Sequence, residues 1–136
     1  FAPVDGAMIF YSMADKAGGT VNTGTDVWTA GGTYTAGAVT AGIQLTSLDL
    51  SAANSDVDRT HIAASFAVNE DLSVSWGMST VEFEAASKVD QEDSGFSVSY
   101  TMGSMTIAAA ANNSDNVGGT SGTDDTHKEM SIAFAF

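Results

Sequence analysis

Residues 126–136 read T-H-K-E-M-S-I-A-F-A-F, and from residue 130 onward every second side chain is large and apolar. The apolar set is Met130, Ile132, Phe134 and Phe136. A period of two places these side chains on one face of a β-strand and the small residues between them on the other. The apolar face has no polar residue at its end, where a strand of a soluble sheet usually frays or turns polar. The stretch therefore predicts a strand whose apolar face contacts lipid.

Charge and composition exclude several classes of function. The 136 residues include 4 Lys and Arg against 17 Asp and Glu, so the formal net charge is −13. Such a chain is a poor match for nucleic acid, whose phosphates require Lys and Arg, and for the surface of an anionic membrane. The sequence has no cysteine, which excludes disulfides and thiolate metal sites. We therefore expect no nucleic-acid partner.

No apolar run reaches the roughly 18 residues that a transmembrane helix needs. No signal peptide is visible, and the chain begins at Phe1 rather than at Met. Because the opening F-A-P-V-D-G looks like the interior of a longer chain, we expect a fragment.

Alternating patterns predict eight strands. The four clearest are residues 61–68, 72–79, 96–102 and 130–136, and the four weaker ones are residues 7–14, 28–36, 39–45 and 105–111. In residues 7–14 both phases are apolar. Near residues 45–50 and 80–83 the alternation slips by one residue, which predicts either a β-bulge or the exit of the strand from a membrane.

The connections between these strands alternate in length. Three are tight, at Gly37, Asn69–Asp71 and Gly103–Ser104, whereas the others are long and acidic. The long ones cover residues 15–26, 51–58, 86–93 and 112–125. This rhythm, with strands of about nine to twelve residues, predicts an all-β transmembrane antiparallel up-and-down β-barrel. The alternative is a soluble, secreted β-sandwich that acts as a binding module, because a sandwich also buries one face of each strand.

Three segments resemble Gram-negative outer-membrane porins. M-S-I-A-F-A-F at residues 130–136 is similar to the closing strand of porins. W-T-A-G-G-T-Y-T-A-G-A-V-T-A-G-I-Q at 28–44 and E-D-L-S-V-S-W-G-M-S at 70–79 resemble hairpins of alphaproteobacterial, Rhodobacter-like porins. The likeness covers most of the chain, but only the terminal Phe signature is specific, and it marks outer-membrane barrels generally.

The resemblance implies a passive channel for small hydrophilic solutes and ions in the bacterial outer membrane, with no enzymatic activity. Such porins are homotrimers of sixteen-stranded barrels in contact with lipid and lipopolysaccharide. Residues 1–136 would then be the C-terminal half of one barrel domain. Phe134 and Phe136 would form the signal by which the barrel assembly machinery recognises the last strand.

Two observations refine this expectation. The predicted inward faces carry mostly Ser, Thr, Ala and Gly, which would leave an eight-stranded barrel hollow but suit a wide, water-filled lumen. A complete eight-stranded barrel serving as an anchor or adhesion surface remains the alternative within the membrane. The acidic constriction loop of porins belongs to their N-terminal half and is not part of these residues, so details of selectivity cannot be transferred.

Arg59 and His61 are the candidate pore-lining residues. Both have the phase opposite to Ile62 and should point inward, where an arginine could set a local field for ions. The alternative is an ion pair between Arg59 and a carboxylate near the rim, either Asp56 or Asp58.

Other candidate sites are weaker. Carboxylates in the long loops could hold Ca²⁺, although none of the runs fits the EF-hand spacing, and solvated loop surface is the alternative. The calcium candidates are Asp90, Glu92, Asp93, Asp124 and Asp125, and no other cofactor is expected. Aromatic residues could form interfacial girdles; these are Trp28, Tyr34, Trp76, Tyr100, Phe134 and Phe136. Residues 117–120 lack the strand–loop–helix context of a phosphate-binding loop.

Overall fold

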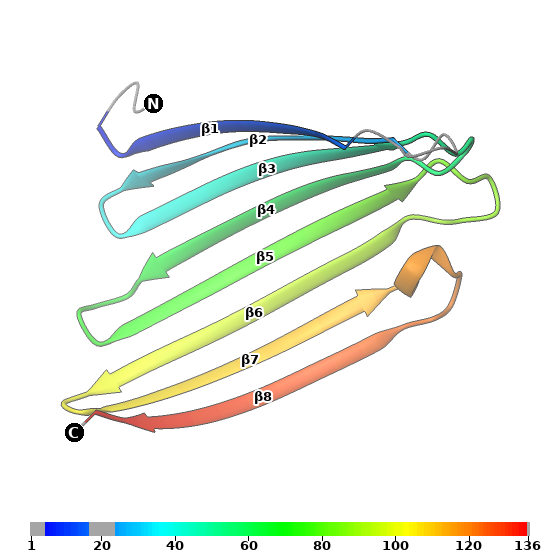
Figure 1. The fold of residues 1–136 in the computed structure, drawn as a ribbon. Coiled ribbons are helices and arrows are strands. Elements are labelled where there is room, and N and C mark those ends of the chain that lie inside the picture. The colour runs from blue at the N-terminus through cyan, green and yellow to red at the C-terminus, as the bar shows by residue number, and fades with distance from the viewer. Residues whose placement is uncertain (1–4, 17–23, 136) are drawn as a thin grey trace.

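The computed structural model describes residues 5–16 and 24–135 as one antiparallel sheet of eight strands in sequence order (Figure 1). The strands are β1 (Ala7–Lys16), β2 (Thr25–Ala36), β3 (Val39–Leu50), β4 (Val57–Ala67), β5 (Leu72–Phe83), β6 (Gln91–Met102), β7 (Met105–Asp115) and β8 (Asp125–Phe134). A single 3₁₀ turn, η1 (Val117–Gly119), follows β7. No helix among the described residues is long and apolar enough to cross a membrane.

All eight expected strands are present, and the up-and-down order is confirmed. Their ends at the long-loop rim extend further than the alternation indicated. Residues 46–50, 80–83 and 112–115 belong to strands, and β6 begins at Gln91 within the expected loop 86–93. Between β1 and β2, residues 17–23 lie outside the described residues.

The tight connections form where the sequence placed them. Gly37 and Gly103 occupy the first position of two-residue hairpins with φ of +61° and +60°, values that glycine adopts without strain. In the β4–β5 turn, the Asn69 side-chain oxygen accepts hydrogen bonds from the backbone N–H groups of Asp71 and Leu72 at 2.9 and 2.8 Å. These three turns form one rim of the sheet.

The two phase slips do not contain bulges. β3 pairs without interruption with β2 from Val39 to Leu50, and β5 pairs without interruption with β4 up to Phe83. The sheet therefore continues regularly while the apolar residues change face. The prediction of a bulge is therefore wrong. Apolar residues such as Leu48 and Val81 simply lie on the same face as the hydroxyl groups that are found nearer the short-turn rim.

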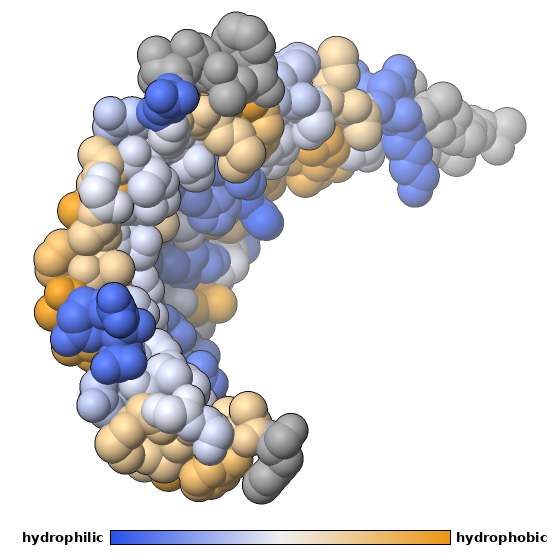
Figure 2. Space-filling view, turned by 90° about the vertical axis from the view of Figure 1, so that its left-hand side faces the viewer, coloured by the Kyte–Doolittle hydropathy of each residue, from blue (hydrophilic) through white to orange (hydrophobic). Residues whose placement is uncertain are grey.

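The sheet is a single curved layer. Viewed along the strands, it forms an open arc with apolar residues gathered on the convex surface and polar residues on the concave one (Figure 2). Among the described residues only Val81 and Gly119 are buried, so the sheet has no packed core on either face. The sandwich alternative, which requires two facing sheets, is therefore not the fold of the described residues. No pairing joins β8 to β1 in the described part of the chain, so the sheet is not closed into a barrel.

Candidate functional site

The cross-strand register assigns every strand residue to a face, because residues directly opposite one another point the same way. The convex face carries an exposed belt of large apolar side chains. Its largest members are Ile9, Tyr11, Met13, Trp28, Tyr34, Ile43, Leu45, Ile62, Phe66, Trp76, Met78, Phe96, Tyr100, Met102, Met130, Ile132 and Phe134. This belt includes every aromatic girdle candidate except Phe136, which lies outside the described residues.

The convex belt runs diagonally across the hydrogen-bonded rows of the sheet. The belt has an edge that faces the long-loop rim. On β1 this edge is at Met13, which is in register with Glu82 of β5 through the intervening strands. On β8 the same edge is at Met130, which is in register with Val74 of β5. The belt thus shifts by the eight residues that separate Val74 from Glu82. With about 3.3 Å per residue and about 4.8 Å between strands, a belt lying level corresponds to strands tilted by about 40°.

The concave face is small and hydroxyl-rich. Pairs of hydroxyl groups on neighbouring strands hydrogen-bond across it. They are Thr29 with Thr46 (3.2 Å), Thr35 with Thr40 (2.9 Å), Ser75 with Ser97 (2.6 Å) and Thr101 with Thr106 (3.1 Å). Each pair satisfies part of the hydrogen-bonding capacity of its groups and leaves further capacity for water.

Glycine and alanine form a row at mid-height of the concave face. Gly42, Ala63, Gly77 and Gly95 lie in direct register on β3 to β6. A shallow depression of about 430 Å³ lies over this row. The surface is hollowed over this row, although the Thr33 methyl group lies beside Gly42 and the Asn112 side chain lies beside Gly95.

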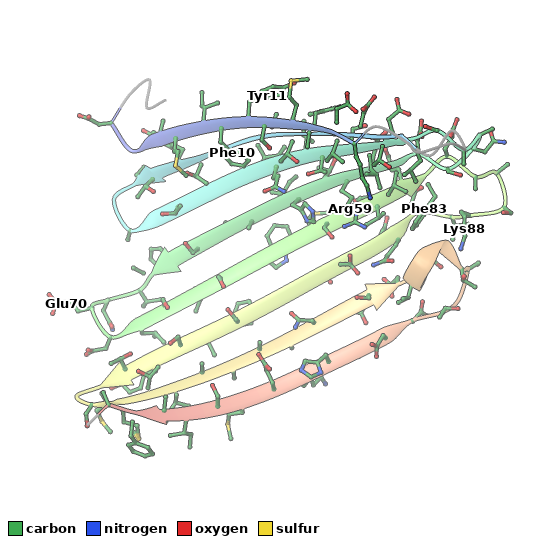
Figure 3. All side chains as sticks on the ribbon, in the orientation of Figure 1. Phe10, Tyr11, Arg59, Glu70, Phe83 and Lys88 are labelled. Atoms are coloured by element: carbon green, nitrogen blue, oxygen red, sulfur yellow. The ribbon has the colours of Figure 1, made fainter. Side chains whose placement is uncertain are left out.

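Arg59 and His61 both lie on the concave face, as their phase predicted. Arg59 lies opposite Thr46 and Val81, and His61 lies opposite Gln44 and Ser79 (Figure 3 shows Arg59). Whether that face lines a pore stays a prediction.

The alternative reading of Arg59, an ion pair at the rim, does not occur within the described residues. Asp58 points to the opposite, convex face. The Asp56 carboxylate instead accepts a hydrogen bond from the Leu50 backbone N–H at 2.8 Å. In the described part, His127 Nε2 lies 3.6 Å from Glu129 Oε2 on β8, a contact that is an ion pair only when the imidazole is protonated.

A polar row that includes His61 crosses the concave face, and the sequence does not predict it. His61, Ser79 and Asp93 lie in direct register on β4, β5 and β6. The Ser79 hydroxyl donates to the Asp93 carboxylate at 2.9 Å, and the Gln91 amide donates to both carboxylate oxygens at 2.9 and 3.1 Å. The row depends on the register between β4, β5 and β6, which the pattern of a single strand does not reveal.

The row contains a serine, a histidine and an aspartate, but not in the order of a catalytic triad. In a triad the histidine lies between the serine and the carboxylate and accepts the serine proton. Here the serine lies between the other two and donates to the carboxylate. In this arrangement the Ser79 hydroxyl donates its hydrogen bond to the Asp93 carboxylate and not to His61.

The calcium candidates are dispersed. Glu92 and Asp93 are neighbours on β6 and therefore point to opposite faces, whereas Asp90 lies in the preceding loop. Asp124 accepts a hydrogen bond from the Asn116 backbone N–H at 3.1 Å, and Asp125 begins β8. In the described part of the chain, no group of three or more His, Cys, Asp or Glu residues could hold a metal ion. Calcium binding stays a prediction.

An acidic row borders the apolar belt at the long-loop rim. Asp15 lies opposite Asp26, and Asp26 opposite Asp49, on the convex face. The pairs Asp58–Glu82 and Glu92–Asp115 continue the pattern on β4 to β7. Like charges directly opposite one another destabilise a sheet unless water or ions screen them. This part of the convex face is therefore suited to water.

β1 departs from the division between the faces. Met8 and Phe10 point to the concave side, while Ile9 and Tyr11 belong to the convex belt, so both phases are apolar as the sequence indicated. The Phe10 ring (Figure 3) lies over Gly31. A Cβ atom on residue 31 would lie only 2.5 Å from the Cζ atom of Phe10.

No protein-family model, curated protein or solved structure matches the chain. The chemistry of the sheet is therefore inferred from its two faces. One face presents a tilted, exposed apolar belt bordered by carboxylates, and the other presents mainly hydroxyls, amides and small residues, with Arg59, His61 and Asp93 among them. A sheet of this kind can separate an apolar phase from an aqueous one.

Proposed function

We propose that this chain forms part of the wall of a porin-type channel in the bacterial outer membrane, through which small hydrophilic solutes and ions diffuse passively. The observation that carries the proposal is the exposed convex belt and its stagger. Laid level with a membrane, the belt tilts the strands by about 40°, within the roughly 35–45° typical of transmembrane barrels. A surface of that extent would be costly to expose to water.

The concave face supports a water-filled lumen over a filled interior. A closed barrel of eight strands has an interior that side chains must fill. The hydroxyl pairs and the row of Gly42, Ala63, Gly77 and Gly95 have side chains too small to fill such an interior. The sheet also curves only as an open arc (Figure 2). A barrel with about twice as many strands has a wide aqueous lumen that tolerates such residues.

The free edges of β1 and β8 require partners in this setting. In lipid, every backbone N–H and C=O group must find an internal hydrogen bond, so a transmembrane sheet has to be closed. We propose that further strands complete a sixteen-stranded barrel and that three such barrels associate. Lipid and lipopolysaccharide would contact the convex belt, and the barrel assembly machinery would insert the protein.

The charge balance implies a moderate preference for cations. The chain carries 17 Asp and Glu against 4 Lys and Arg, so the mouth of the channel would have a negative potential. Such a field concentrates cations and is screened over about 10 Å at 0.1 M salt. Arg59 on the concave face would oppose it locally.

The test is conductance in planar bilayers, using the intact natural protein. We expect stepwise, voltage-tolerant conductance with moderate cation preference, strongest at low salt. Arg59→Gln should increase that preference, because it removes a positive charge from the lumen wall, whereas Lys128→Gln on the convex face should leave it unchanged. Absence of conductance would refute the channel, and anion preference would refute the proposed field. Equal behaviour of the two variants would refute the placement of Arg59.

A further inference from the structure

The connection between β7 and β8 bends back over the concave side of the sheet. Its 3₁₀ turn, η1, lies beside β6 at the long-loop rim (Figure 1). Gly119, at the end of η1, is one of two buried residues in the described part of the chain. It packs against Phe83, the last residue of β5, which lies in the concave phase together with Val81. The loop thus reaches across β6 to touch β5.

Polar contacts fasten the loop at this position. The Lys88 ammonium donates to the Gly118 carbonyl oxygen at 2.5 Å, and the Gly118 N–H donates to the side-chain oxygen of Gln91 at 2.8 Å. The Val89 N–H donates to the Gly119 carbonyl at 3.2 Å. Further along, the Asn116 amide donates to the Asp90 carbonyl at 3.1 Å. Both strands of the β5–β6 hairpin and its loop therefore hold the β7–β8 loop.

Packing adds to these hydrogen bonds. The Lys88 nitrogen lies 5.8 Å from the centroid of the Phe83 ring, within the range of a cation–π interaction (Figure 3). A Cβ atom on Gly119 would lie 2.8 Å from both the Lys88 Cδ and a Phe83 ring carbon. Gly119 also has φ of +71°, which disfavours any other residue. We call Phe83, Lys88, Gln91, Gly118 and Gly119 the loop anchor.

We propose that the loop anchor holds residues 116–124 as a fixed ledge at the mouth of the channel, and that this ledge lowers the size of the largest solute that passes. The inference rests on the proposed channel function. Residues 116–124 contain a single charged side chain, Asp124, and otherwise small or uncharged ones. The ledge therefore acts on solute size more than on charge, since pore diameter and charged rings are separate determinants of selectivity.

Two variants and a matched control test the ledge in the intact natural protein. Lys88→Met keeps the aliphatic stem over Phe83 but removes the ammonium donor, and Gly119→Val clashes with the anchor. Lys128→Met removes the same charge from the convex face of β8. Hydrogen exchange of the Gly118 and Val89 amides reports the anchor directly, and should be about tenfold faster in Lys88→Met because one charge-assisted hydrogen bond is lost. Liposome swelling with neutral sugars of increasing size reports the size limit.

The expected result is faster exchange and entry of larger sugars for Lys88→Met and Gly119→Val, with Lys128→Met like the wild type. If the wild type admits sugars and all three variants share its size limit, the ledge is refuted while the channel stands. If the wild type admits no sugar, the channel and the size-limiting role both fall, even where exchange shows an intact anchor. Lys88→Met decides the question if Gly119→Val does not fold.

Discussion

At the scale of single residues, the face of a side chain depends on its position in the strand and not on its own chemistry. Asp58 and Glu82 lie on the convex face, whereas Val81 lies on the concave face. These positions are all near the long-loop rim, where the proposed barrel leaves the lipid. There the free-energy reason for apolar residues outside and polar residues inside disappears, because both faces meet water.

Adjacent residues in the middle of β6 provide a matched comparison. Val98 belongs to the convex face and Ser99 to the concave face. Val98→Lys should lower the free energy of unfolding in lipid by about 2–4 kcal/mol, because it places a charge in hydrocarbon near the bilayer midplane. Ser99→Lys should be mild, since its ammonium group stays in water. Unfolding by denaturant in lipid vesicles measures both, and equal losses would indicate a packed interior.

Individual residues of the candidate site could be predicted only in part. The phase of Arg59 and His61 is visible within one strand, so their face follows from the sequence. The hydrogen bond from Ser79 to Asp93 requires the relative position of two strands joined by a long loop. No local pattern encodes that position.

At the scale of elements, the period of two predicted all eight strands and their order. The two-residue turns at Gly37 and Gly103 also fix the pairing of β2 with β3 and of β6 with β7. The strands extend further at the long-loop rim than the alternation predicts, because polar residues there resemble loops although hydrogen bonding continues. The fold of residues 116–124 onto Phe83 had no signal except the glycines at 118 and 119.

The last strand supplies a prediction about assembly. The porin resemblance implies that the terminal aromatic residue helps the assembly machinery to recognise β8 before the barrel closes. Deletion of Phe136 should therefore reduce the amount of heat-resistant, assembled barrel in outer membranes more than a loop substitution such as Ser121→Ala. Heat-modifiable mobility in gels measures this amount, and normal assembly of the deletion would contradict the role of the C-terminal signal.

At the scale of the whole molecule, the stagger of the convex belt links strand register to membrane orientation. The side chains of each strand determine whether it contributes to the belt, to the acidic row or to the hydroxyl-rich concave face. The positions of these features relative to one another depend on the register of all eight strands. The sequence alone does not display the resulting tilt or the open curvature. Lipid on one side and water on the other would stabilise a sheet that lacks a packed core.

The proposed channel requires that the convex face contacts lipid and that the concave face contacts water. Because the chain contains no cysteine, single cysteines can be placed at each position from Leu72 to Ser79 without a background signal. In the membrane-inserted protein, we expect a charged, water-soluble thiol reagent to label positions 73, 75, 77 and 79 rapidly and positions 72, 74, 76 and 78 slowly. A lipid-soluble reagent should give the reverse. Equal labelling of both sets by the water-soluble reagent would contradict the account.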